Sequence, residues 1–214
     1  VFARDGAGLE PTQTLASNRG TSRFEDVEAF LRDGGQRGPQ RTILREGTYA
    51  INLAQFAVIT EERVYFLPLN REETAVFQEM ATLLEIREGF SPIVIQGAED
   101  RLGIVTVHDG PALADQQIIA PVVGAMPTDG ATYHNCFQDP EKFLAAGGRR
   151  GRQLQVLVEG TYYINRLFAT IELVPKTVIH VGNVGVVVSY TGELGLDLAG
   201  KDYKHGELVK NGER

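Results

Sequence analysis

The feature that most constrains this chain of 214 residues is an internal repeat. Residues 24–52 (FEDVEAFLRDGGQRGPQRTILREGTYAIN) align without a gap on residues 137–165 (FQDPEKFLAAGGRRGRQLQVLVEGTYYIN). Roughly 60% of the aligned positions are identical, far more than unrelated segments share by chance. Because such self-similarity marks tandem architectures, we expect the chain to fold as copies of one small unit that gain stability by packing on each other.

The unit extends beyond this core. Upstream, RDGAGLEPTQTLA (residues 4–16) resembles HDGPALADQQIIA (108–120), and LGIVTV (102–107) resembles part of VGVVVSYTG (184–192), where a third copy is expected. We therefore predict four segments, which are a first module over residues 1–68, a helical insertion over 69–91, a second module over 92–174 and the start of a third over 175–214. Because both ends fall inside a unit, we expect a longer parent protein.

Each unit predicts the same local structure. A β-branched strand such as GIVTV leads into a glycine turn, and a short helix follows, with the capping-box pair Ser22 and Glu25 in the first copy and the N-cap Asp139 in the second. Double glycines at 34–35 and 147–148 end the helix, and a hairpin is expected to turn at Glu-Gly, at 46–47 or 159–160. The expected fold class is mainly β (α+β), with tandem small antiparallel β-modules that each carry one short helix.

The insertion breaks the repeat and reads as an amphipathic helix over residues 71–88. Apolar residues recur there at helical spacing, with mostly polar residues opposite. The candidate partner interface on this stripe is Val76, Phe77, Met80 and Leu84. The alternative is that the stripe packs against its own module.

Composition excludes several partners. The formal net charge of −7 is unfavourable for binding nucleic acid, because a protein must neutralise phosphates with a basic surface. The sequence contains no apolar run of the roughly 20 residues that a membrane-spanning helix needs. We therefore expect a soluble segment, with no nucleic-acid partner and no small-molecule substrate.

No reactive constellation emerges from the sequence. His134, Cys136 and Asp139 lie close together, but Cys136 aligns with Arg23 in the first copy, so a duplicated active site is excluded and a buried structural cysteine is favoured. The remaining histidines show no metal-ligand spacing, and GGRRG (147–151) follows a helix, whereas phosphate loops precede one. We expect no catalytic, cofactor or metal site, and we expect Arg37 and Arg150 to form salt bridges or interfaces.

The repeated pattern VGVV…DG…FQD…FL…GG…RG.Q…L..GTY.IN…F resembles the repeats that accompany the band 7 domain in bacterial proteins of the stomatin, prohibitin and flotillin (SPFH) superfamily. It is also distantly similar to the β-rich repeats of the major vault protein. The resemblance implies a non-enzymatic oligomerisation module of a flotillin-like scaffold. Its parent would form a homo-oligomeric ring or cage associated with the bacterial inner membrane through segments outside this sequence. The alternative is an accessory or regulatory region of a membrane protease complex.

Overall fold

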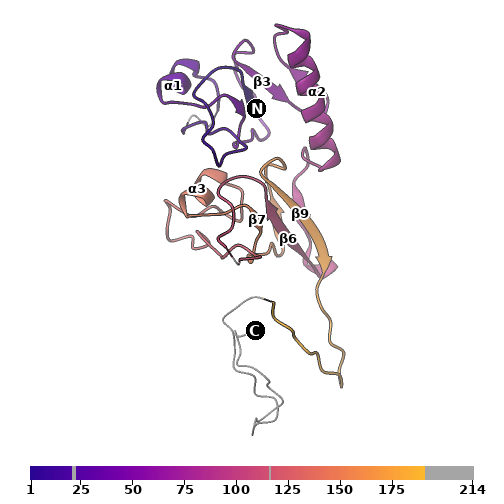
Figure 1. The fold of residues 1–214 in the computed structure, drawn as a ribbon. Helices are drawn as coiled ribbons and strands as arrows, with labels where there is room; N and C mark the ends of the chain where they lie inside the picture. The colour runs from indigo at the N-terminus through magenta and orange to yellow at the C-terminus, as the bar shows by residue number, and fades with distance from the viewer. Residues whose placement is uncertain (21–22, 116, 191–214) are drawn as a thin grey trace.

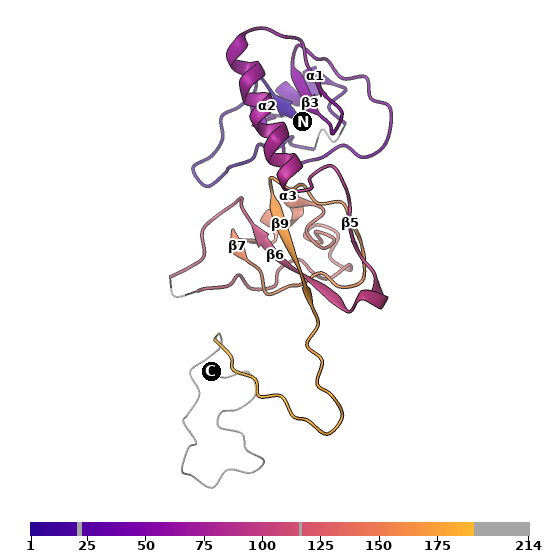
Figure 2. The ribbon, with the colours of Figure 1, turned by 90° about the vertical axis from the view of Figure 1, so that its right-hand side faces the viewer.

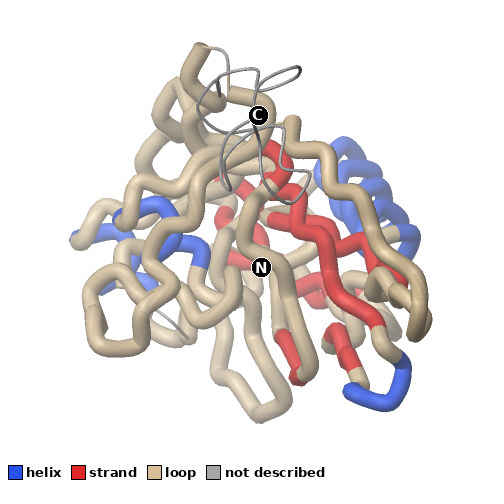
Figure 3. Tube along the Cα trace, turned by 90° about the horizontal axis from the view of Figure 1, so that it is seen from below, coloured by secondary structure: helices blue, strands red, loops and turns tan. Residues whose placement is uncertain are grey.

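The computed structural model describes residues 1–20, 23–115 and 117–190, and these form a mainly β structure with short helices, as the repeat predicts. Two bodies are stacked along one axis in both side views, so the described part is elongated (Figures 1 and 2). The helices lie toward the outside of the stack, and most strands lie nearer the middle (Figure 3). Helices α1 (Val27–Arg32) and α3 (Pro140–Ala145) share one side, and α2 (Arg71–Ile86) lies on the other (Figure 1).

The first body is built on a small antiparallel sheet in the order β2-β1-β3-β4. Its central strand places Ala3 opposite both Gly38 and Phe56. The sheet is closed by a short outer strand that pairs with β3. Its strands are β1 (Phe2–Ala3), β2 (Gly38–Pro39), β3 (Phe56–Ile59) and β4 (Val64–Tyr65).

The second body repeats this arrangement with longer strands, in the order β7-β6-β9. Val107 faces Gly151 on one side and Ala169 on the other, which reproduces the position of Ala3 in the first sheet. A separate pair, β5 with β8, lies beside it, and a 3-10 turn, η1 (Gly97–Glu99), connects β5 to β6. The strands are β5 (Ile93–Ile95), β6 (Arg101–Val107), β7 (Gly151–Arg152), β8 (Gly160–Tyr162) and β9 (Ala169–Pro175).

The two short helices begin and end by the same devices. Asp26 caps α1 by accepting a bond from the Ala29 amide at 2.8 Å, and Asp139 caps α3 by accepting one from the Lys142 amide at 3.1 Å. Ser22 of the expected capping box lies outside the described residues, but the helix begins at Val27 with Asp26 as its N-cap, so the predicted start is corrected. An aspartate competes well for this position, since its carboxylate satisfies an unpaired amide of the first turn.

A buried glutamine locks the same turn in each body. The side-chain amide of Gln40 donates to the carbonyls of Gln36 and Gly38 at 2.8 and 3.0 Å. Gln153 makes the equivalent bonds to Arg149 and Gly151, both at 2.8 Å. A buried amide that is bonded in this way stabilises one chain path, because leaving its donors unpaired would cost about 1–3 kcal/mol.

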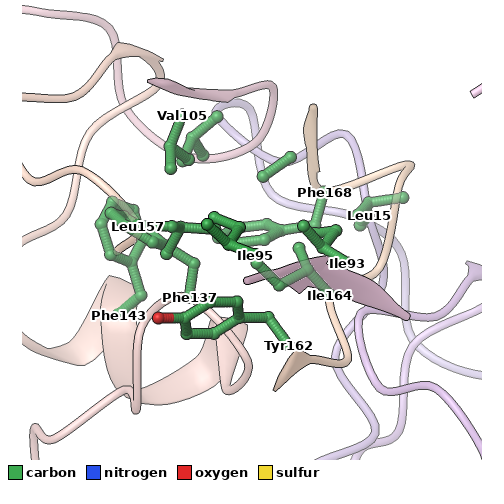
Figure 4. Close-up of a cluster of buried hydrophobic side chains, with 12 residues drawn as sticks. Leu15, Ile93, Ile95, Val105, Phe137, Phe143, Leu157, Tyr162, Ile164 and Phe168 are labelled. Carbon is green, nitrogen blue, oxygen red and sulfur yellow. The ribbon is translucent and has the colours of Figure 1, made fainter. Parts of the chain in front are cut away.

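Each body has its own aromatic core. Phe24, Phe30 and Phe56 pack edge to face or tilted, with ring centroids 5.1–6.4 Å apart, and all three are fully buried. The second core centres on Phe137, Phe143 and Phe168, with centroids 5.4 and 5.7 Å apart along the chain of contacts (Figure 4).

Their third rings occupy different ladder positions. Phe56 stands opposite Ala3, whereas Ala169 stands opposite Val107, so the third ring of the second core, Phe168, lies one position before the paired residue.

The expected Glu-Gly hairpin does not form. In the second body β8 pairs antiparallel with β5, which comes from before the repeat core, and not with the residues preceding the turn. In the first body residues 42–51 belong to no strand. A two-residue hairpin of the favoured kind needs positive φ at one or both central positions in a matching frame. At each Glu-Gly pair only the glycine has a positive φ, which is 156° at Gly47 and 155° at Gly160, so the backbone bends there without forming such a turn.

A buried ionic joint connects the two bodies. The guanidinium Nε of Arg41 donates to the Asp109 carboxylate at 2.7 Å, and these side chains are only 4% and 0% exposed. The same carboxylate accepts the backbone amide of Thr14 at 2.7 Å. From the other side, the amide of Asn165 donates to the carbonyls of Gln40 and Arg41 at 3.0 and 2.9 Å. The joint is therefore desolvated but well supplied with hydrogen bonds.

The predicted start of a third copy is only partly within the described residues. Val184–Tyr190 were expected to form a strand like β6, but residues 176–190 belong to no strand and are exposed. In the second body, β6 is held by β7 and β9, and these partners have no third counterpart in the part of the chain that the structure describes. The remainder of the predicted third module, residues 191–214, lies outside the described residues.

Candidate functional site

A groove of about 840 Å³ lies beside helix α2. It runs beside the first body, with the C-terminal half of α2 on one side and part of the second body on the other. Its lining is mostly apolar or aromatic, with a few charged side chains at its rim. The lining includes Val1, Leu44, Tyr49, Ile51, Met80, Leu84 and Tyr163, and the charged residues are Arg45, Glu46 and Glu61.

The insertion forms helix α2, as its spacing predicts, and Asn70 caps it by accepting the Glu73 amide at 2.8 Å. Its apolar stripe is divided between two environments. Phe77 is 1% exposed and packs edge to face on the rings of Phe2 and Phe66, at 5.2 and 5.3 Å. Phe77 therefore belongs to the core of its own module and presents no surface to a partner.

The other three candidate interface residues remain accessible. Met80 and Leu84 are half-buried and line the groove, and Val76 is 45% exposed. The helix thus attaches to the module through Phe77 and leaves its C-terminal apolar side chains to form one wall of the groove.

Arg45 bridges the two bodies at the edge of this groove. Its guanidinium carbon lies 3.7 Å from the centre of the Tyr163 ring. Such a cation–π contact contributes about 0.5–1 kcal/mol at exposed positions. The rim therefore provides positive charge and an aromatic face next to an apolar floor.

The sequence cluster of His134, Cys136 and Asp139 is structural. The His134 ring is fully buried, its Nδ1 accepts the Phe137 amide and its Nε2 donates to the Val123 carbonyl, both at 2.8 Å. Desolvation lowers the pKa of His134, and burial raises the pKa of the Cys136 thiol. Because the histidine nitrogens are both used and the thiol is held protonated, the cluster lacks an available base and a nucleophile.

The other sequence candidates are dispersed. Within residues 1–20, 23–115 and 117–190, no group of three or more histidine, cysteine, aspartate or glutamate side chains is placed to hold a metal ion. Arg37 and Arg150 are exposed and form no ion pair in that same part of the chain, contrary to the expectation of salt bridges. No helix among these residues is both long and apolar enough to cross a bilayer.

Two features of the site have no local signal in the sequence. The joint between Arg41 and Asp109 links residues of different repeats, and Arg41 aligns with Leu154 in the second copy. The groove likewise depends on how α2 lies against the first body. A position where one copy carries a buried charge and the other an apolar residue is the signal that could have pointed to the joint.

Searches of family models, curated proteins and solved structures returned no match to this chain.

Proposed function

We propose that this chain is a non-enzymatic structural module that serves assembly in a flotillin-like, band 7 membrane-associated scaffold. The observation that carries the proposal is the duplicated body. Two copies with the same caps, glutamine locks and aromatic cores are connected by a buried joint. Tandem units whose contacts are internal or with neighbouring units are typical of extended scaffolds, because each added unit lengthens a binding surface.

The side-chain chemistry supports this proposal. Four deeply buried polar side chains, those of Gln40, Gln153, His134 and Asp109, bond to backbone or to the joint. Enzymes instead arrange such groups around a cavity where a substrate can reach them. The residues lining the groove are mainly apolar, as expected for a surface that contacts protein.

The test is the assembly state of the longest natural polypeptide that contains these residues, extracted from membranes in mild detergent. Under the proposal, electron microscopy and mass photometry show a closed ring or cage of many copies. A particle of one copy, or a one-to-one complex with a membrane protease, contradicts the scaffold role. The second outcome supports the regulatory alternative.

A further inference from the structure

Arg166 has an unusual environment for a charged side chain. The residue is 7% exposed, and its Nε is buried without a hydrogen-bond partner. Desolvation lowers the pKa of Arg166, and the charge of the nearby Glu88 carboxylate offsets this only in part. Because an arginine stays protonated in proteins, burial of its guanidinium without a partner is unfavourable.

Two other buried arginines of this chain have carboxylate partners. Arg41 donates to Asp109 at 2.7 Å and to Glu141 at 3.1 Å. The side chain of Arg4 is also 7% exposed, and it pairs with Glu73 of α2 at 3.2 Å. Arg166 differs from both, because no carboxylate in the described part of the chain lies within ion-pair distance of it.

A second guanidinium lies beside Arg166. Arg87, the residue after α2, donates from Nη1 to the backbone carbonyl of Arg166 at 2.9 Å. Desolvation lowers the pKa of His108, and the positive charge of Arg87 lowers it further, so these side chains are close together. Among residues 1–20, 23–115 and 117–190, Arg87 also has no ion-pair partner. Two positive charges therefore meet without a carboxylate where the end of α2 reaches the second body (Figure 2).

The first body shows how a buried guanidinium is paired at the equivalent place. The backbone amide of Arg4 donates to the Gln55 carbonyl at 2.9 Å. The amide of His108 donates to the Phe168 carbonyl at 2.8 Å in the same way. The segments that contain these two carbonyls are therefore equivalent in the two bodies.

The carbonyl two residues earlier accepts a guanidinium in each body. Nη1 of Arg4 donates to the Leu53 carbonyl at 3.1 Å, and Nη1 of Arg87 donates to the Arg166 carbonyl at 2.9 Å. In the first body one arginine and the carboxylate of Glu73 meet beside an apolar side chain. In the second body the apolar side chain is replaced by another arginine, and the described residues supply no such carboxylate.

The surroundings of Arg166 restrict what can supply the missing charge. They are formed by the end of α2, by His108 after β6, and by the turn that leads into β9. All of these residues lie in the interior of the chain, and they leave 7% of Arg166 exposed. Because Arg87 beside it is only half-buried, the opening suits a small ion rather than another chain segment.

We propose that Arg87 and Arg166 form a binding site for a small, doubly charged oxyanion such as inorganic phosphate or sulfate. Guanidinium groups match the oxygen geometry of these anions, and hydrogen bonds between charged groups are roughly twice as strong as neutral ones. The anion supplies the negative charge that Glu73 supplies in the first body, and it joins the end of α2 to the second body. The site does not depend on the scaffold role.

Chemical denaturation measures binding through stability. An anion that binds only the folded chain should lower the equilibrium constant for unfolding about 100-fold when its concentration is about 100 times the dissociation constant. Phosphate, sulfate and acetate are compared at one ionic strength, which is maintained with sodium chloride. We expect a saturable response to phosphate and sulfate and a weaker one to acetate. A response that grows without saturation is the general effect of excluded salts and overturns the proposal. Equal binding of acetate overturns the preference for a doubly charged anion.

Arg166→Leu is the sharpest variant, because Leu53 holds this place in the first body. It should abolish the saturable response, and in chloride alone it should not lower stability, since an unpaired buried charge is removed. Arg150→Leu removes an exposed arginine and is the matched control, which should keep the response. Equal responses in these two variants overturn the proposal. If Arg166→Leu does not fold, Arg87→Gln should weaken binding about tenfold or more through loss of one charged donor, and unchanged binding overturns the site.

Nuclear magnetic resonance locates the bound anion. The Nε of Arg166 has no hydrogen-bond partner, so its N–H resonance should shift as phosphate is added. The shift should saturate at the same concentration as the gain in stability. Stabilisation by phosphate without this shift places the anion elsewhere and overturns the proposal.

The phosphate of a lipid headgroup has the same chemistry as the free ion. Co-sedimentation with vesicles of phosphatidylcholine and phosphatidic acid distinguishes the two sources. We expect the vesicles to leave the chain in solution, because Arg166 is too deeply buried to reach a headgroup that is held in a bilayer. Retention on the vesicles that Arg166→Leu abolishes would overturn the assignment to a free ion.

Discussion

The two bodies of this protein share a framework and differ at their boundaries. Inside, the helix caps, the glutamine locks and two of the three core phenylalanines correspond position by position. Outside, the second body is covered by β5 and receives the ionic joint through Asp109, whereas the first has a groove and supplies Arg41. The comparison teaches that the repeated residues specify the fold of a unit, and that a changed residue, Arg41 in place of Leu154, specifies a contact between units.

The largest expected effect comes from giving the first body the residue of the second at the joint. Arg41→Leu, which places the counterpart of Leu154 there, leaves the fully buried Asp109 without its cation. Loss of one partner of a buried pair costs about 3–5 kcal/mol. Chemical denaturation measures this as a lower free energy of unfolding.

Two controls accompany that variant. Arg150→Leu removes an exposed arginine and should change stability by less than about 0.5 kcal/mol. The double variant Arg41→Leu/Asp109→Asn should regain part of the loss, because the buried charge is gone. If Arg41→Leu costs no more than Arg150→Leu, the joint does not hold the bodies together.

Substitution of one equivalent glycine in each body should produce a smaller loss of stability, of similar size in both, and this tests whether the two cores are packed alike. A Cβ added at Gly35 would lie 2.5 Å from the Phe30 ring, and one at Gly148 would lie 2.3 Å from the Phe143 ring. Gly35→Ala and Gly148→Ala should each destabilise by about 1–3 kcal/mol, as overpacked cores do. Gly8→Ala, where nothing lies within 4 Å, is the control for both in thermal unfolding. A cost at only one of the two sites would contradict the equivalence of the cores.

Hydrogen exchange should reveal the difference in cover. The amides of residues 47–49 have no strand partner, whereas Gly160–Tyr162 pair with β5. A net hydrogen bond contributes about 1 kcal/mol, so we expect exchange in the first segment to be faster by about fivefold at concentrations where the chain is monomeric. Mass spectrometry of peptic fragments measures both segments in one sample. Equal protection would mean that the first edge is already covered.

The smallest expected effect is a pH dependence of the free energy of unfolding, which arises from a histidine in the second body. Desolvation lowers the pKa of His134 in the folded state, so the unfolded chain takes up a proton first as the pH falls below about 6.5. The free energy of unfolding should therefore decrease between pH 7.5 and 5. His134→Gln should flatten this slope, and His180→Gln, on the exposed tail, should not. An unchanged slope in His134→Gln would assign the titration to another group.

Helices, helix ends and strands could be predicted from the sequence where the residues that determine them are close together in the chain. The amphipathic spacing predicts α2, the double glycines predict where α1 and α3 end, and the β-branched runs predict β6 and β9. The helix start predicted from the capping-box spacing was wrong, because the N-cap of α1 is Asp26, which aligns with the correctly predicted cap Asp139. Alignment of the two copies would have identified Asp26 as the cap from the sequence alone.

Features that depend on distant partners could not be read in this way. The hairpin expected at Glu159–Gly160 does not form, because β8 pairs with β5 instead. This strand lies more than 60 residues earlier in the chain and supplies two buried isoleucines. Of the predicted interface residues, Phe77 is buried because Phe2 and Phe66 come from elsewhere to meet it. Spacing indicates which face of a helix is apolar, but the residues that cover this face are set by tertiary packing.

The ionic joint has a consequence for the order of the units. Chains of near-identical modules are prone to misassembly, since one copy can pair with the wrong neighbour during folding. Asp109 bonds to the guanidinium of Arg41 and to the hydroxyl of Thr14, the latter at 3.1 Å, whereas the second body presents Leu154 and Ile118 at the matching positions. A carboxylate buried against those apolar side chains would lack a cation. The buried ion pair therefore favours assembly of the two modules in one order along the chain.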